Sequence, residues 1–179
     1  MKPSERKSLF EKLFDESAGM IYNLGLRLFN NAEDARDFSQ DVFFQAYEKL
    51  HSFKYRSKVS TWLYALALNY GLKRIKSEKR LKISYESETF IENTPSEDNN
   101  SAEKLNEELS SEETNQQIRT ELNTLPEKLR LPLVLYYYEK LSYKEIAKKL
   151  ALKEGTLKTY IFKGKQQLSD RLRKHGFKP

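Results

Sequence analysis

The feature that most constrains this chain is the stretch from Leu141 to Leu168, LSYKEIAKKLALKEGTLKTYIFKGKQQL. The spacing of its apolar residues predicts two short helices with a tight turn between them. Ser142 is followed three residues later by Glu145, which predicts a capping box at the start of the first helix. The second helix is predicted to start near Glu154 or Gly155. The stretch therefore predicts a helix-turn-helix.

The second of these predicted helices has an apolar side and a polar side. At about 100° per residue, Leu157, Ile161, Leu168 and Leu172 fall on one side. The opposite side carries Thr156, Thr159, Phe162, Lys163 and Gln166. A small cationic surface of this kind fits a DNA major groove. An ordinary helical hairpin with solvated lysine side chains would give the same pattern, so both interpretations stand.

The composition favours an all-α protein that acts on an anionic partner. Glycine (6) and proline (5) are scarce among the 179 residues, and a chain of this length can form two small helical domains. The net charge of +6 favours an anionic partner. There is no cysteine, and His51 and His175 lack metal-ligand spacing. We therefore expect no enzyme, no cofactor and no bound metal. The chain has neither an apolar leader nor a run of about 18 apolar residues, and we expect a soluble cytoplasmic protein.

An acidic stripe lies on the second of two predicted N-terminal helices, which span residues 5–29 and 32–50. The buried stripe of the second helix is predicted to be Ala35, Phe38, Val42, Ala46 and Leu50. Asp34, Asp37 and Asp41 share another side, with Gln40 beside them. Like charges at this spacing repel by a few tenths of a kcal/mol per pair. A basic partner would relieve that repulsion, although acids near a helix N-terminus are also favourable in solvent.

Aromatic and basic residues alternate in the loop HSFKYRSK, where Phe53 and Tyr55 are interleaved with Lys54, Arg56 and Lys58. Stacking surfaces beside cations suit single-stranded nucleic acid, although the two rings could simply anchor the loop to the core. Ser60 is the predicted N-cap of a third helix that is apolar nearly all round, and it becomes basic after Leu72.

The segment 84–117 has ten acidic residues and one basic residue, so it carries −9 and the rest of the chain +15. Few apolar residues and many Ser, Asn and Glu predict a flexible acidic linker. It could serve as a solubilising tether or mimic nucleic acid. Helix is predicted again over 118–139, with Thr124 as cap, Pro126 as first helical residue and a kink or delay at Pro132. The predicted domains are therefore 1–83 and 118–179, separated by the linker.

Two regions of the chain resemble an ECF (extracytoplasmic function) sigma factor, a short two-domain specificity subunit of bacterial RNA polymerase. The first is AEDARDFSQDVFFQAYEKL followed by FKYRSKVSTWLYALALN. The second is LPEKLRLPLVLYYYEKLSYKEIAKKLALKEGTLKTYIFKGKQQL. The resemblance implies an N-terminal sigma region 2 domain and a C-terminal sigma region 4 domain. It also implies three partners: the polymerase core, promoter DNA and an anti-sigma factor.

The resemblance also implies roles for individual residues. The residues implied to bind the coiled coil of the largest polymerase subunit are Asp34, Asp37, Gln40 and Asp41. The residues implied to bind the minus-ten element are Phe53, Lys54, Tyr55, Arg56, Lys58, Trp62, Asn69, Lys73 and Arg74. The residues implied to bind the minus-thirty-five element are Ser142, Lys153, Glu154, Thr156, Lys158, Thr159 and Lys163. The second domain is expected to meet the polymerase flap, and the linker to thread the cleft as an RNA mimic. The chain departs from the family pattern at three positions. A basic residue is usual at the position of Leu68, and arginine is usual at the positions of Tyr160 and Lys163.

Two other functions fit parts of the pattern. One is a helix-turn-helix regulator that binds duplex DNA and has no role with core polymerase. The other is a scaffold whose basic domains hold acidic partners. The stretch from Phe53 to Arg74 distinguishes them, since a plain duplex binder needs no aromatic and cationic loop for an unpaired base. We expect the protein in the cytoplasm, associated with the nucleoid when it is bound to polymerase.

Overall fold

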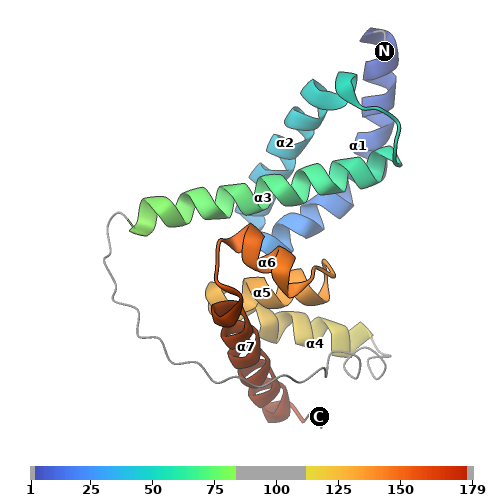
Figure 1. Ribbon diagram of the computed structural model, residues 1–179. Helices are drawn as coiled ribbons and strands as arrows, with labels where there is room; N and C mark the ends of the chain where they lie inside the picture. Colours follow the sequence, from blue (N-terminus) through green and yellow to red (C-terminus); the bar gives the residue numbers. More distant parts are fainter. Residues whose placement is uncertain (1–2, 84–111, 177–179) are drawn as a thin grey trace. The chain divides into compact units, whose positions relative to one another are not determined.

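The computed structural model describes residues 3–83 and 112–176, and within these ranges it contains helices and no strand. The helices are α1 (Pro3–Phe29), α2 (Ala32–Lys49), the short 3-10 helix η1 (Leu50–Ser52), α3 (Val59–Ile83), α4 (Glu112–Asn123), α5 (Glu127–Tyr137), α6 (Tyr143–Leu150) and α7 (Glu154–Lys174) (Figure 1). The predicted all-α class is confirmed. The chain divides into two compact units, Met1–Glu88 and Thr89–Pro179. Residues 84–111 of the predicted acidic linker lie outside the described residues, and residues 112–117 begin α4.

The core of the first unit is built around α2. Helices α1 and α2 pack side by side and α3 crosses them (Figure 1). The predicted stripe of α2 is confirmed, because all five of its members are buried: Ala35, Phe38, Val42, Ala46 and Leu50. Phe38 is fully buried, with ring centroids 5.4 Å from Phe29 of α1 and 6.1 Å from Tyr70 of α3. The apolar spacing of α2 thus fixes the side that holds the three helices together.

Two glycines let the other helices approach Phe38 closely. A Cβ on Gly25 would lie 2.9 Å from Phe38 Cδ1, and one on Gly71 would lie 2.5 Å from Leu28 Cδ1. Distances this short do not occur between real side chains, so a larger residue at either position would push the helices apart. Gly25 looks like a local weakness of α1 in the sequence. In the structure it is a site of helix packing.

The predicted start of the third helix is wrong. The N–H of Trp62 donates to the carbonyl of Lys58 at 3.1 Å, and α3 begins at Val59. The first helical hydrogen bond is therefore accepted two residues before Ser60, which lies inside the first turn and is not the N-cap. This earlier start brings Trp62 next to the loop that precedes the helix.

The second unit has a core formed by α5, α6 and α7. The predicted core residues Leu129, Leu133 and Val134 are buried, as are Leu157 and Ile161 of α7. The rest of the predicted apolar side of α7, Leu168 and Leu172, is only half-buried, and Tyr138 is exposed, against the prediction.

Gly164 is a core position of α7 that the sequence does not reveal. A Cβ at Gly164 would lie 2.9 Å from Leu133 Cδ1 and 3.2 Å from the carbonyl oxygen of Leu129. The glycine therefore lets α7 pack closely on α5.

The region predicted as helix over 118–139 contains two helices, since α4 ends at Asn123 and α5 begins at Glu127. Pro126 is the N-cap of α5, with extended backbone angles (φ −54°, ψ 140°), and not its first helical residue. Thr124 does not cap α5, because its hydroxyl donates to the carbonyl of Glu121 at 2.7 Å. Pro132 does not delay α5, which continues to Tyr137. Pro132 has no N–H, so α5 lacks one intrahelical hydrogen bond there.

The predicted helix-turn-helix is confirmed in α6 and α7. The Ser142 hydroxyl accepts from the Glu145 N–H at 3.3 Å, and Glu145 Oε2 accepts from the Ser142 N–H at 2.9 Å. The hydrogen bonds from Ser142 lower the pKa of Glu145, because they stabilise its carboxylate form. Helix α7 starts at Glu154, as predicted.

The turn after α6 gives a stability prediction. Ala151 has left-handed backbone angles (φ 56°, ψ 41°), which strain a residue with a Cβ but not glycine. We expect Ala151→Gly to stabilise the protein by about 0.5–1 kcal/mol in denaturant unfolding followed by far-UV circular dichroism. The control is Ala147→Gly, the same change inside α6, which should destabilise by about 1 kcal/mol or more. Loss of stability in Ala151→Gly would contradict the left-handed turn.

Candidate nucleic-acid interface

Tyr55 and Phe53 of the loop before α3 form a row of three aromatic rings with Trp62 of α3, which we call the aromatic row. The ring centroids are 4.9 Å apart between Tyr55 and Phe53 and 5.4 Å apart between Phe53 and Trp62. Phe53 is half-buried, whereas Tyr55 is 68% exposed and has a left-handed φ of 53°. Phe53 therefore anchors the loop, and Tyr55 offers a ring to solvent. The three cations predicted in the loop, Lys54, Arg56 and Lys58, are all exposed.

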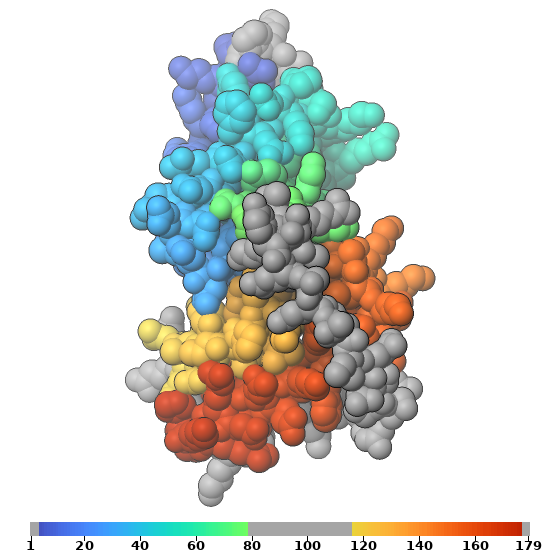
Figure 2. Space-filling view, turned by 90° about the vertical axis from the view of Figure 1, so that its left-hand side faces the viewer, coloured from blue at the N-terminus to red at the C-terminus, as the bar shows by residue number. Residues whose placement is uncertain are grey.

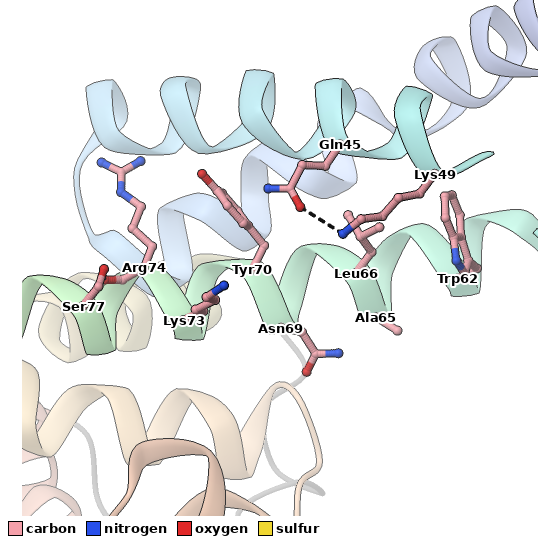
Figure 3. A pocket seen from close by; sticks show the side chains of 10 residues that line it. All are labelled: Gln45, Lys49, Trp62, Ala65, Leu66, Asn69, Tyr70, Lys73, Arg74 and Ser77. Carbon is pink, nitrogen blue, oxygen red and sulfur yellow. Dashed lines mark hydrogen bonds between the residues drawn. The ribbon is translucent and has the colours of Figure 1, made fainter. Parts of the chain in front are cut away.

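A groove of about 620 Å³ runs between α2 and α3, and we call it the α2–α3 groove (Figure 3). It is lined by Gln45, Lys49, Trp62, Ala65, Leu66, Asn69, Tyr70, Lys73, Arg74 and Ser77. Trp62 belongs to both the groove and the aromatic row, so the loop and the groove form one continuous surface. The lining includes three cations and no acid. It therefore combines apolar walls with positive charge.

The groove contains four of the predicted minus-ten residues, Trp62, Asn69, Lys73 and Arg74. Its other six lining residues lie outside the predicted site: Gln45, Lys49, Ala65, Leu66, Tyr70 and Ser77. Gln45 and Lys49 come from α2, where the Lys49 Nζ donates to Gln45 Oε1 at 3.3 Å (Figure 3). Tyr70 comes from α3. The two α2 residues lie four apart at the edge of the buried stripe. That spacing was the signal available in the sequence, but it does not indicate that Gln45 and Lys49 face α3.

Tyr70 is fixed in the wall of the groove by two contacts. Its ring stacks on Phe38, and its hydroxyl donates to Asp41 Oδ2 at 2.7 Å. Burial, and then the hydrogen bond to Asp41, raise the pKa of Tyr70 to about 12. Its phenol therefore stays neutral at physiological pH and holds its proton toward Asp41.

Arg74 contacts three residues of the first unit, Asp34, Glu78 and Phe29. Its Nη2 lies 2.9 Å from Asp34 Oδ1, and its Nε lies 2.9 Å from Glu78 Oε1. The guanidinium also lies 4.9 Å from the ring centroid of Phe29. Asp34 and Arg74 were predicted to bind different partners, and the structure brings them together.

The acidic stripe of α2 is thereby divided between two sides of the helix. Asp34 and Asp41 contact α3, whereas Asp37 and Gln40 are exposed. Phe44, seven residues after Asp37, shares that exposed side and is 67% exposed. We call Asp37, Gln40 and Phe44 the outward face of α2. The space-filling view shows α2, in blue to cyan, at the surface of the first unit (Figure 2).

The predicted recognition surface of α7 is largely accessible. Lys153, Glu154, Lys158 and Lys163 are exposed, and Thr156 and Thr159 are half-buried. Phe162, which the sequence placed on this side but not among the site residues, is 63% exposed. Ser142 is exposed, although its hydroxyl already serves the capping box of α6.

In the described part of the chain, no helix is both long and apolar enough to cross a membrane.

Comparison with known proteins matches both units. The family model for Sigma-70 region 2 matches residues 13–81, and the model for Sigma-70 region 4 matches residues 115–168. The chain is 31% identical over 175 residues to the ECF RNA polymerase sigma factor SigW of Bacillus subtilis, covering 92% of this chain and 89% of SigW. It is 28% identical over 166 residues to the ECF RNA polymerase sigma factor SigE of Mycolicibacterium smegmatis, covering 93% of this chain and 62% of SigE. The sigma factor RpoE of Bartonella quintana, solved with the anti-sigma factor NepR, has the same fold, with a TM-score of 0.50 and 20% identity over 92% of this chain and 96% of that one.

Two helical units that match Sigma-70 regions 2 and 4, in this order, define a sigma factor of the Sigma-70 class. The relatives place it further, and the chain belongs to the ECF family of RNA polymerase sigma factors. The resemblance drawn from the sequence is confirmed. The sigma-factor function is favoured over that of a helix-turn-helix regulator without a polymerase role.

Proposed function

We propose that the first unit of this sigma factor holds the polymerase core with one side of α2 and the melted minus-ten strand with the loop and the α2–α3 groove. The second unit then binds the minus-thirty-five duplex through α7. The observation that carries this proposal is the aromatic row, which leads from an exposed ring, Tyr55, to the cationic groove at Trp62.

The groove has the properties that an unpaired strand requires. Unpairing a base costs a few kcal/mol, and stacking on an aromatic side chain contributes about 1–3 kcal/mol per base. Tyr55 and the half-buried Trp62 supply such rings, and Lys49 and Lys73 supply charges for the backbone. Asn69 is exposed and lines the groove, where its amide can meet a base edge. A protein that binds only intact duplex has no need of this arrangement.

The outward face of α2 fits a basic partner with an apolar hollow. Asp37 and Gln40 share one side of α2 with the exposed ring of Phe44, and Asp34 and Asp41 lie at the edge of the same surface. An apolar anchor with a polar rim is typical of protein interfaces. We assign this surface to the largest polymerase subunit, since a sigma factor must bind the core. Asp34 and Asp41, at the edge of this surface, would then contact both the polymerase and α3.

The remaining parts of the proposal depend on the family and on charge. We propose domains over 1–83 and 118–179, with the acidic segment 84–117 as an RNA mimic because of its net charge of −9. The second domain would meet the polymerase flap. The Bartonella sigma factor was solved with an anti-sigma factor, and we propose that this chain has such a partner too.

The test is initiation by core polymerase on a supercoiled library of genomic fragments, with and without the purified chain. We expect transcripts that start at a defined set of sites and need the chain. Binding of single-stranded DNA is measured separately by fluorescence of Trp62, the one tryptophan of the chain. Duplex binding without any initiation would contradict the proposal and favour a simple regulator.

Lys163 on α7 gives a prediction about the distal element. If Lys163 reads a base, Lys163→Ala should weaken binding by about 1–3 kcal/mol and relax the sequence preference at one position. The measurement is competition between the site and its single-base variants. The control is Lys174→Ala in the last turn of the same helix, where Lys174 is also exposed. An equal loss for every sequence would make Lys163 a phosphate contact.

A further inference from the structure

The contacts of Arg74 leave its charge more than neutralised. Its guanidinium makes ionic hydrogen bonds to Asp34 and to Glu78, both at 2.9 Å. Its side chain is only 22% exposed, whereas those of Asp34 and Glu78 are 42% and 49% exposed. Arg74, Asp34 and Glu78 together carry a net charge of −1, so Arg74 itself adds no net positive charge to the α2–α3 groove. A DNA phosphate would compete for the guanidinium with two carboxylates that are already in place.

One of these carboxylates lies on the helix that we assign to core binding. Asp34 precedes Asp37 by three residues and Asp41 by seven, so it lies at the edge of the acidic surface of α2. A basic group of the polymerase that binds Asp34 would take one of the two carboxylates away from Arg74. Arg74 would keep one carboxylate, that of Glu78 on α3 itself, together with its contact to the Phe29 ring, and its charge would be balanced.

We propose that Asp34 holds Arg74 in an autoinhibitory contact in the free protein, and that core polymerase releases Arg74 to the phosphates of the melted promoter strand by binding Asp34. This inference rests on the proposed function, because it takes α2 as the core-binding helix. By linkage, the coupling acts in both directions. A promoter strand that takes Arg74 frees Asp34 for the core, so each partner strengthens the binding of the other.

The first test compares two substitutions that remove the same charge from α2 in the free chain. Asp34 contacts Arg74, and Asp37 is exposed one turn away on the outward face. The probe is a short oligodeoxythymidine strand, measured by quenching of Trp62 fluorescence. We expect Asp34→Asn to raise the affinity about fivefold, as for loss of a half-exposed ion pair, and Asp37→Asn to raise it less than about twofold. Equal effects of the two substitutions would overturn the proposal.

The second test asks whether Arg74 is the cause. In an Arg74→Gln background, Asp34→Asn should have no greater effect than Asp37→Asn, because the contact that it removes no longer exists. An excess that persists without Arg74 would mean that general charge, and not this contact, limits binding. Helix content from circular dichroism verifies that each variant is folded.

The third test separates the coupling from the proposed function. Arg74→Gln should change strand affinity less than about twofold in the free chain and weaken it about tenfold in the complex with core. The same loss in both states would overturn the coupling while leaving the function intact. Failure of the wild-type chain to initiate, or to show quenching of Trp62 by the strand, would instead count against the proposed function.

Discussion

Reversing two charges on α2, with Asp37→Lys and Asp41→Lys together, is expected to weaken association with core polymerase by about 100-fold or more. Each substitution replaces an attraction to a basic partner with a repulsion, and like charges that face each other across an interface cost several kcal/mol. Both side chains are exposed, so the helical fold should persist. The measurement is affinity capture of core polymerase, followed by titration of the retained complex.

The matched control is Glu11→Lys with Glu16→Lys on α1. These glutamates are 62% and 64% exposed and form surface ion pairs with Lys7 and Lys12. Replacing two acids with two lysines changes the net charge by the same amount as in the α2 variant. Association in this control should fall far less. Because Asp41 also accepts the Tyr70 hydrogen bond, the single variant Asp37→Lys shows how much of the loss belongs to the outward face. Unchanged capture of polymerase by the double variant would make this assignment of α2 wrong.

Phe38→Ala is expected to lower the free energy of unfolding of the first unit by about 3–5 kcal/mol. Phe38 is fully buried between Phe29 and Tyr70, and helices packed so closely at Gly25 and Gly71 cannot collapse fully into the space. A loss of this size is a large part of the stability of a small domain. Trp62 lies in this unit and is the one tryptophan of the chain, so its fluorescence in denaturant follows this unit alone.

Phe44→Ala is the control for this stability effect, since it makes the same change on the same helix at a residue that is 67% exposed. A change within about 0.5 kcal/mol is expected there. A loss below about 1 kcal/mol for Phe38→Ala would contradict the central place of this ring. In core binding we expect the opposite order, with the larger loss for Phe44→Ala, because we propose Phe44 as the apolar anchor of that interface.

Helices with regular apolar spacing could be predicted from the sequence. The stripe of α2 and the capping box at Ser142 depend on residues three or four apart, and such neighbours interact within one helix whatever surrounds it. The errors occurred where local rules compete. Ser60 is a good cap in isolation, but the helix begins one residue before it. Pro126 fits either the cap or the first helical position, and it occupies the cap of a separate helix.

The candidate site could be predicted only in part, because its pairings join distant segments. The loop cations and the exposed residues of α7 follow from polarity and spacing. The contact of Asp34 with Arg74 spans 40 residues, and that of Asp41 with Tyr70 spans 29. No periodicity within one helix specifies which residues of α3 lie opposite α2. Gln45 and Lys49 were missed for the same reason.

The division of α2 between two sides has a consequence for genetics. We expect a genetic selection for variants with defective promoter recognition or polymerase binding, applied to every codon of this helix, to yield phenotypes that alternate along the chain. Changes at Asp37, Gln40 and Phe44 would impair assembly alone. Changes at Asp34 and Asp41, whose side chains contact α3, would be pleiotropic, and their suppressors would arise in α3 as well as in the polymerase.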